Sequence, residues 1–187
     1  MSLVWVLGLL LFSSTVAAEN SFTEILSEVR SLKSALNELS RKLLCNPNGL
    51  PMHTLNNGET YFFSTTHIGA ELSWYRAKQF CKTNKMDLAS PKTQEEINLL
   101  VRKGKEIDEE VTWHLSATDV GREHGDFRWA DGDVLHLNSS LWQSRPGSFQ
   151  RGEQLCAYVN PEQTDKLKVH NCIIRANIIC QLPAKCK

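Results

Sequence analysis

The chain has 187 residues, which suits one domain of ordinary size or one domain with an appendage. Its 21 basic residues balance its 21 acidic residues without any basic block, so the composition does not predict a nucleic-acid surface or an anionic-membrane patch. With 41% hydrophobic residues the chain can bury a core, which excludes disorder of the whole chain.

The beginning of the chain is typical of a secretory signal. Leu3–Phe12 is an uninterrupted apolar run that is too short to span a bilayer. Small residues follow, and Val16-Ala17-Ala18 places them where a signal peptidase cuts. We therefore expect residues 1–18 to be a signal peptide, the product to be secreted and extracellular, and the rest of the chain to carry no membrane span.

Secretion determines how the cysteines are interpreted. An even number of cysteines in an oxidising compartment predicts disulfide bonds. A zinc site is the alternative, but the chain has no Cys-x2-Cys pair and no His-Glu-x-x-His motif. No nucleophile or acid–base pair has a recognisable spacing either, so the sequence does not predict an enzyme. The six cysteines are Cys45, Cys81, Cys156, Cys172, Cys180 and Cys186.

Residues 22–43 carry apolar side chains at alternating spacings of three and four, which is a heptad pattern. Glu28 and Lys33 then fall at positions g and e, where opposite charges attract across parallel helices. We expect a coiled-coil neck over residues 19–45 that joins two or three chains into a homo- or hetero-oligomer. The alternative is an amphipathic helix folded back onto the chain, because so short a helix is marginal unless its stripe is buried. The apolar positions are Phe22, Ile25, Val29, Leu32, Leu36, Leu39 and Leu43.

Residues 46–187 have the pattern of a mixed domain. A strand over Tyr61–Phe63 is followed by helices over Leu72–Lys82 and Thr93–Arg102, and Thr93 with Glu96 forms a capping box for the second helix. This order predicts an α+β domain with two helices, small antiparallel sheets and long loops. The later segments are short strand-like runs between turn residues, namely Thr112–Ser116, Asp126–Trp129, Leu155–Val159, Val169–Ile173 and Asn177–Leu182.

Motifs in this region resemble the C-type lectin-like domain. Trp74-x2-Ala77-x3-Cys81 followed by Leu88-Ala89 resembles its first helix and the next turn, and the segment from Trp113 to Asp119 is similar to its Trp-Ile-Gly-Leu strand. Gly125-Asp126-Phe127-Arg128-Trp129 resembles its Glu-Gly-x-Phe-x-Trp segment, and Trp142 resembles the tryptophan ahead of its sugar loop. The likeness covers roughly residues 55–182, and the Thr-Asp-x-Gly-x-Glu-x-Gly-x-Phe segment is similar to short secreted lectins of insects and other arthropods.

The resemblance implies two disulfide bonds, Cys81–Cys180 and Cys156–Cys172. The first closes the longer loop and should contribute on the order of 4–5 kcal/mol, and the second about 3 kcal/mol. The terminal strands of this fold resemble an antiparallel pair, so an intrachain Cys45–Cys186 bond is expected, with an interchain bond at Cys45 as the alternative.

The resemblance also implies a calcium-dependent sugar site, and this chain departs from its ligand set. The family's oxygen ligands come from a Glu-Pro-Asn or Gln-Pro-Asp loop, an acid two residues before the domain's third cysteine, and a Trp-Asn-Asp triplet. Here the loop is Ser144-Arg145-Pro146-Gly147, the acid's position holds Gln154 beside Glu153, and the triplet is Leu167-Lys168-Val169. Calcium takes six to eight oxygen ligands. We therefore expect no cofactor, and at most weak calcium binding.

Other acids and cations could still serve a site. Asp119 and Glu123 match the first acids of an auxiliary calcium site and, with Glu153, are the remnant metal candidates; a solvated turn is the alternative. Arg145, Arg151, Lys166, Lys168 and His170 are expected on the long-loop face, which could bind sulfated or sialylated glycans or an acidic protein without calcium. A merely solvated surface is the alternative there. The candidate ligand-binding residues are Arg145, Pro146, Glu153, Gln154, Lys168 and His170.

The sequence thus predicts a secreted C-type lectin-like recognition protein without the usual calcium-dependent sugar site. Protein partners or microbial and host surface ligands are expected, with a role in innate immunity. The alternative is a calcium-dependent carbohydrate-binding lectin with an atypical site. The sequon Asn138-Ser139-Ser140 predicts N-glycosylation at Asn138.

Overall fold

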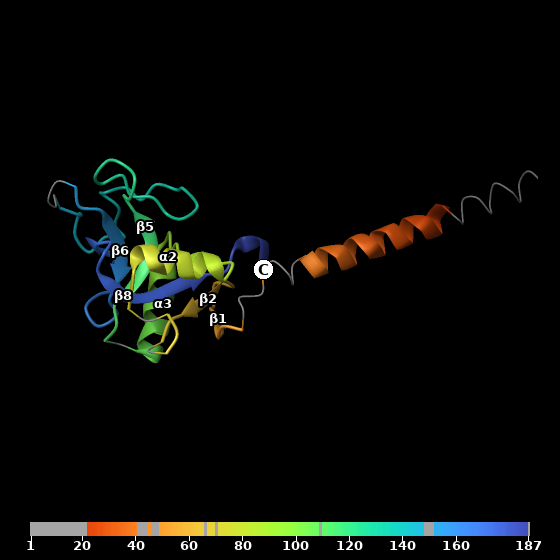
Figure 1. Cartoon of the computed structure of the whole chain (residues 1–187), viewed down its shortest axis with the longest axis horizontal. Helices are drawn as coiled ribbons and strands as arrows, with labels where there is room; N and C mark the ends of the chain where they lie inside the picture. Colours follow the sequence, from red (N-terminus) through yellow and green to blue (C-terminus); the bar gives the residue numbers. More distant parts are fainter. Residues whose placement is uncertain are drawn as a thin grey trace, which may run out of the picture. The chain divides into compact units, whose positions relative to one another are not determined.

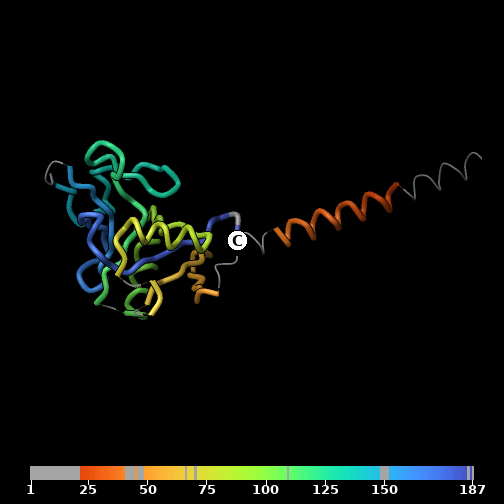
Figure 2. Tube along the Cα trace, in the orientation of Figure 1, coloured from red at the N-terminus to blue at the C-terminus, as the bar shows by residue number. Residues whose placement is uncertain are grey.

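The computed structural model describes residues 22–40, 45, 49–65, 67–69, 71–108, 110–147 and 152–186. Figure 2 draws the remaining residues in grey, and the expected signal peptide at 1–18 lies outside the described residues. The chain divides into two units between Leu44 and Cys45. No helix within the described ranges is long and apolar enough to cross a membrane.

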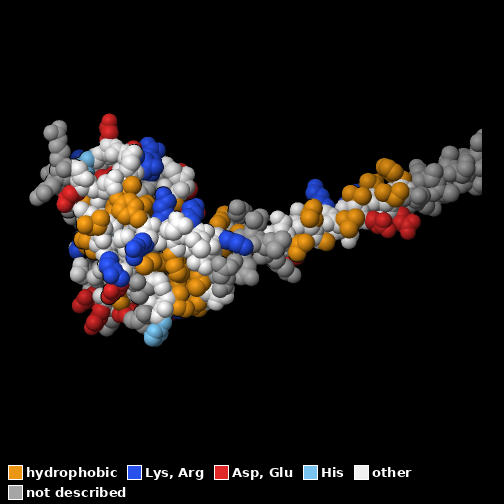
Figure 3. Space-filling model, in the orientation of Figure 1, with side chains coloured by type: hydrophobic (Ala, Val, Ile, Leu, Met, Phe, Trp, Pro, Cys, Tyr) orange, Lys and Arg blue, Asp and Glu red, His pale blue; other side chains and the backbone are white. Residues whose placement is uncertain are grey.

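In the described part of the first unit, residues 22–40 form a helix. Its heptad side chains are exposed, with Leu32 at 70% and Leu36 at 66% of full accessibility. Figure 3 shows apolar side chains along this helix. The predicted helix is therefore present as far as residue 40, and its expected last residues, 41–43, lie outside the described residues. An exposed apolar stripe of this kind needs a partner surface in water.

The second unit is built on a sheet that runs in the order β1-β2-β8-β5-β6-β7 (Figure 1). Neighbouring strands are antiparallel except for β5 and β8, which are parallel and pair Trp113 with Asn177. The short strands β3 and β4 both pair with β8, which makes β8 the most connected strand. The strands are β1 (Met52–Thr54), β2 (Thr60–Phe63), β3 (Leu72–Ser73), β4 (Asp87–Leu88), β5 (Trp113–Thr118), β6 (Leu155–Val159), β7 (Lys168–Asn171) and β8 (Arg175–Gln181).

Two α-helices accompany this sheet, as the sequence predicts. α2 spans Trp74–Thr83 and α3 spans Gln94–Ile107. α3 begins at the predicted capping box: the backbone N–H of Glu96 donates to Thr93 Oγ1 at 3.2 Å, and the Glu96 carboxylate accepts from the Thr93 N–H at 3.0 Å. α3 continues past the expected end at Arg102 to Ile107, and the buried Gly104 lies in this added turn. A short 3-10 turn, Ala184–Cys186, follows β8.

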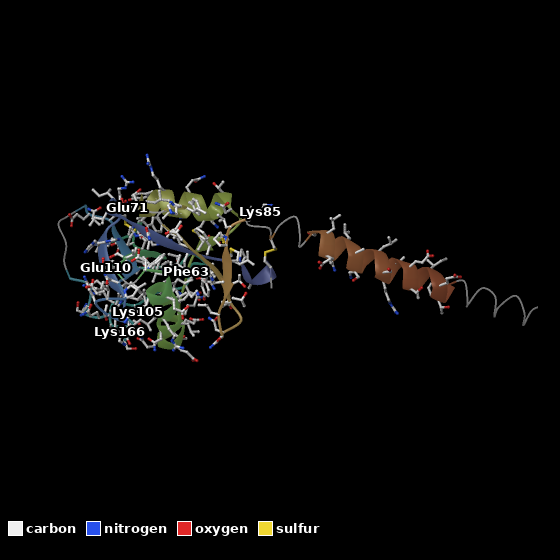
Figure 4. All side chains as sticks on the ribbon, turned by 90° about the horizontal axis from the view of Figure 1, so that it is seen from below. Phe63, Glu71, Lys85, Lys105, Glu110 and Lys166 are labelled. Carbon is white, nitrogen blue, oxygen red and sulfur yellow. A yellow bond between two sulfur atoms is a disulfide. The ribbon has the colours of Figure 1, made fainter. Side chains whose placement is uncertain are left out.

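The core of the second unit consists of two clusters of buried side chains. The larger cluster surrounds Trp113 and includes Phe63, whose ring meets the Trp113 ring edge-on at 5.5 Å; Phe63 is labelled in Figure 4. The smaller cluster contains Trp74 and Ala77 of α2 together with four half-cystines. The indole N–H of Trp74 donates to the Leu115 carbonyl at 2.8 Å and so ties α2 to β5. The tryptophans of the Trp74 motif and of the Trp113 motif therefore both belong to the core.

All three expected disulfide bonds are present within the chain. Their Cα–Cα distances are 5.3 Å for Cys45–Cys186, 5.5 Å for Cys81–Cys180 and 5.1 Å for Cys156–Cys172, each within the usual range. The first joins the two ends of the second unit, the next ties α2 to β8, and the last holds β6 to the end of β7.

One expected strand is not a strand. The segment Asp126–Trp129 forms only bridges, in which Arg128 pairs with Thr118 on one side and Val134 on the other. Turns on both sides interrupt it, since Gly125 and Gly132 adopt positive φ angles of 86° and 94°. The segment still places Phe127 and Trp129 in the core. Its alternating pattern therefore indicates which side chains are buried, although the segment forms no continuous ladder of strand hydrogen bonds.

Candidate ligand-binding surface

Asp119 lies just after β5 and is almost completely buried. Its Oδ1 accepts a hydrogen bond from the Leu155 N–H at 2.7 Å, and its Oδ2 accepts one from the Gly125 N–H at 3.1 Å. His124 Nδ1 lies 3.4 Å from Oδ2. Both carboxylate oxygens are thus used to fasten the loop after β5 to the start of β6, which is a structural role.

The other remnant acids differ from Asp119 in burial. Glu123 is exposed and Glu153 is half-buried. Within the described part of the chain, no three His, Cys, Asp or Glu side chains form a group that could hold a metal ion. Calcium requires six to eight oxygen ligands, mostly carboxylates. The residues that the structure describes do not fit a calcium ion in the family's arrangement.

The Pro146 loop borders a hollow of about 340 Å³. Arg145, Pro146 and Gly147 form one wall, and Phe127, Leu137 and Leu155 supply apolar contacts. Arg145 is exposed, so the cation that replaces the expected carboxylate or amide reaches solvent beside the hollow. The peptide bond between Arg145 and Pro146 is trans. Arg151 lies outside the described residues.

The residues at the triplet position divide between core and surface. Leu167 is fully buried and forms a parallel bridge with Trp142, so it belongs to the core. Lys168 begins β7, where its Nζ donates to Gln163 Oε1 at 2.8 Å and lies 5.9 Å from the Tyr158 ring centroid. The Lys168 ammonium group is therefore held by Gln163 and lies near the Tyr158 ring.

His170 is half-buried and pairs with the buried His114. Its Nε2 lies 3.2 Å from Nδ1 of His114, and its ring stacks on Tyr158 with centroids 4.4 Å apart. His114 Nε2 lies 3.0 Å from the Leu72 carbonyl oxygen and 3.2 Å from that of Ile174. Because carbonyls only accept, His114 carries its proton on Nε2, and its Nδ1 accepts from His170.

Burial governs the protonation of this pair. Desolvation lowers the pKa of His114 to about 4, against the opposing effect of its hydrogen bonds to Leu72 and Ile174. Desolvation, followed by the nearby His114, lowers the pKa of His170 to about 3. Both rings are neutral at physiological pH. The sequence did not single out His114 as a functional residue. The available signal was a histidine between Trp113 and Leu115 in β5, a strand whose side chains are all buried.

The six predicted site residues therefore fall into separate groups. Arg145 and Pro146 border the hollow, whereas Lys168 and His170 lie with Tyr158 on β6 and β7. Exposed Gln154 accepts a hydrogen bond from the hydroxyl of Tyr75 on α2. Glu153 stands next to it in the chain. Lys166 Nζ donates to the Ser140 carbonyl at 2.7 Å, and Asn138 lies exposed in the turn nearby.

A comparison with protein families matches residues 70–182 to the family model described as the Lectin C-type domain. The chain is 38% identical over 93 residues to the C-type lectin domain family 4 member F of Homo sapiens. That match covers 50% of this chain and 14% of the human protein. The Rattus norvegicus protein of the same name is 38% identical over 76 residues, 41% of this chain and 12% of that protein. The chain thus matches only a small part of these relatives' length.

Solved structures share the fold. CEL-I from Cucumaria echinata aligns with a TM-score of 0.59 and 18% identity, over 73% of this chain and 99% of that one. TC14 from the tunicate Polyandrocarpa misakiensis aligns at 0.56 and 19%, over 66% and 96%. The trimeric structure of the Kupffer cell receptor Clec4f aligns at 0.56 and 22%, over 84% and 95%. The expected closeness to arthropod proteins stays a prediction.

Proposed function

The chain belongs to the C-type lectin domain family, whose fold is non-enzymatic, and on this premise we propose that it is an extracellular recognition protein without the family's calcium-dependent sugar site. Its ligands are protein partners or glycans on microbial or host surfaces. They are bound directly by side chains and not through a metal ion.

The charge at the sugar-site positions carries this proposal. Arg145 stands in the loop where the family has a carboxylate or amide, and Lys168 stands in the triplet. Like charges repel, so a cation at either ligand position disfavours a divalent cation there. Asp119, the one buried acid nearby, already accepts two backbone N–H groups. Freeing its oxygens for calcium would leave buried donors unpaired, which costs free energy.

Secretion is supported by two independent features. Residues 1–18 have the pattern of a cleaved signal, and the three disulfide bonds suit an oxidising compartment. The exposed sequon at Asn138 suits N-glycosylation in the same pathway. Loss of mass on glycosidase treatment of the protein from eukaryotic cells would establish occupancy.

An oligomeric neck is the second part of the proposal. The apolar stripe of the helix at 22–40 is exposed within one chain, and the structurally similar Clec4f is described as trimeric. Joining chains through residues 22–43 would bury the stripe and present several domains together. Several weak contacts then act as one strong attachment to a repetitive surface, which suits a role in innate immunity. A related lectin chain could be the partner in a hetero-oligomer.

The Pro146 hollow is one proposed ligand contact, with Arg145 as its charged residue and Pro146 in its wall. Lys168 on β7, and Glu153 and Gln154 ahead of β6, are the other proposed contacts of the long-loop face. His170 contributes by fixing Tyr158 and the start of β7, since its ring is engaged with His114. Arg145→Ala should weaken binding of any ligand held there, whereas Lys105→Ala on α3 should not.

Binding to an array of glycans and extracellular proteins, read once with EDTA and once with calcium, tests the proposal. We expect the same ligands to bind in both conditions. Ligands that bind only with calcium would instead identify an atypical calcium-dependent lectin.

A further inference from the structure

A second hollow, of about 280 Å³, lies away from the Pro146 loop, between α2, β4 and the segments that follow β5. Four basic side chains border it: Lys78 and Lys82 from α2, and Arg122 and Arg128 from the loop region. Its one acidic lining residue is Asp87. The buried indoles of Trp74 and Trp129 form part of its wall, which makes it a cationic hollow with a rigid base.

The basic character extends along α2. This helix contains Arg76, Lys78 and Lys82 and has no acidic residue, although the chain as a whole has no net charge. Lys78 and Lys82 are four residues apart, so they lie on the same side of the helix one turn from each other. Figure 3 shows several Lys and Arg side chains gathered on the visible face of the second unit. Lys78 and Lys82 therefore contribute to one positive field at the hollow.

Two of the four cations are compensated and two are not. Lys82 pairs with Asp87 at 2.5 Å, and Arg128 Nε lies 3.4 Å from Asp126 Oδ1. Neither Lys78 nor Arg122 forms an ion pair with a residue that the structure describes. Lys78 Nζ lies 5.2 Å from the Trp74 ring centroid, which holds the ammonium at the hollow. The uncompensated charge favours an anion.

The hydroxyl groups at the hollow are already engaged by the protein. Ser116 Oγ contacts Ser90 Oγ at 2.7 Å and accepts from the Ala130 N–H, and Thr118 Oγ1 donates to the Leu155 carbonyl at 2.8 Å. Binding strength must then come from the ammonium and guanidinium groups. Charge-assisted hydrogen bonds to oxyanions are the strong class of hydrogen bond. An ester with three terminal oxygens can accept from several cations at once, whereas a carboxylate offers two oxygens in one plane.

We propose that this hollow binds a sulfate ester of a sulfated glycan, with Lys78 and Arg122 as the principal contacts. Lys82 and Arg128 line the site as paired cations. The inference goes beyond the proposed function, because it names a ligand class and places it away from the positions of the family's sugar loop.

Binding of a fluorescently labelled, fully sulfated heparin hexasaccharide to the whole chain tests this site. The control ligand is the same hexasaccharide with its sulfates removed. We expect binding that weakens between about 50 mM and about 300 mM NaCl, because salt screens these exposed charges. The double variant Lys78→Gln with Arg122→Gln should bind about tenfold more weakly or worse.

The matched control removes the same charge elsewhere. Arg102→Gln with Lys105→Gln changes two exposed cations of α3, and Figure 4 shows Lys105 away from α2. This double variant should bind within about twofold of the parent, as expected for exposed residues outside a site. In the unaltered chain, the hexasaccharide should protect Lys78 from acetylation and leave Lys105 reactive, which needs no variant to fold.

Equal losses in the two double variants would show unspecific attraction and overturn the proposal. So would unchanged binding in the α2 variant, equal binding of the desulfated ligand, or no binding by the parent. None of these outcomes depends on calcium. The proposed calcium-independent function is tested separately, by the array read with EDTA and with calcium.

Discussion

His170 donates a hydrogen bond from Nε2 to Nδ1 of His114 across 3.2 Å. The Nε2–H of His114 in turn donates to two backbone carbonyls, that of Leu72 in β3 and that of Ile174 between β7 and β8. This short chain of polar groups joins three separate parts of the fold. It depends on the His114 ring being neutral, because a second proton on His114 would remove the acceptor and bury a charge.

Stability should therefore fall with acid. Burial lowers the pKa of His114 to about 4, below its ordinary value of 6.5, so the unfolded chain takes up protons first. The free energy of unfolding should be constant above about pH 6.5 and decline as the pH falls towards 4, by the linkage between proton uptake and unfolding. Urea unfolding at several pH values measures the decline. His170→Phe keeps a ring over Tyr158 and should show a shallower decline; identical profiles would contradict this account.

Asp119 should matter for stability, and its neighbour Glu123 should not. Asp119→Ala leaves the backbone N–H groups of Leu155 and Gly125 without their carboxylate acceptor, which should cost about 2–4 kcal/mol. Glu123 is exposed, so Glu123→Ala should change the unfolding free energy by less than about 0.5 kcal/mol. Denaturant unfolding compares the two variants. Similar effects from both would show that Asp119 has no special structural role.

Gly104 on α3 should be intolerant of a side chain. A Cβ atom there would lie 3.2 Å from Trp113 Nε1 and 3.3 Å from Pro161 Cγ, and the buried indole has little room to move. Gly104→Ala should destabilise the domain by about 1–3 kcal/mol despite alanine's better helix propensity. Gly147→Ala meets no atom within 4 Å and is the matched control. A stabilised Gly104→Ala protein would mean that α3 shifts freely over Trp113.

The neck prediction has its own matched pair of variants. Leu36 lies on the exposed apolar stripe, while Ser34 falls at the outer f position of the same heptads. Leu36→Lys should reduce the mass measured by sedimentation to that of one chain, because a charge would enter the seam. Ser34→Lys should leave the oligomer intact. If the parent is already a single chain, the neck does not assemble.

Local chemistry explains which elements could be predicted from the sequence. The capping box at Thr93 and the heptads need only neighbouring residues, and both helices are present where these patterns predict them. The resemblance in cysteine order implied Cys81–Cys180 and Cys156–Cys172, and the expected pairing of the terminal strands favoured Cys45–Cys186; all three bonds are present.

Long-range packing explains what could not be predicted. The contact of His114 with His170 joins residues 56 positions apart, and the cationic hollow collects side chains from α2 and from the region after β5. No local pattern reports such neighbours. The parallel pairing of β5 with β8 is equally non-local, since it follows from how the chain returns after β7. Conversely, Asp126–Trp129 alternates like a strand but is confined by turns at Gly125 and Gly132.

Thermal unfolding of the protein with EDTA and then with about 10 mM calcium tests the central claim most directly. A site with a dissociation constant of about 1 mM, typical of weak extracellular calcium sites, would add about 1.4 kcal/mol and raise the midpoint by a few degrees. With Arg145 and Lys168 at the ligand positions and the Asp119 oxygens engaged, we predict no shift. A rise of a few degrees would show that calcium binds and would contradict recognition without the metal.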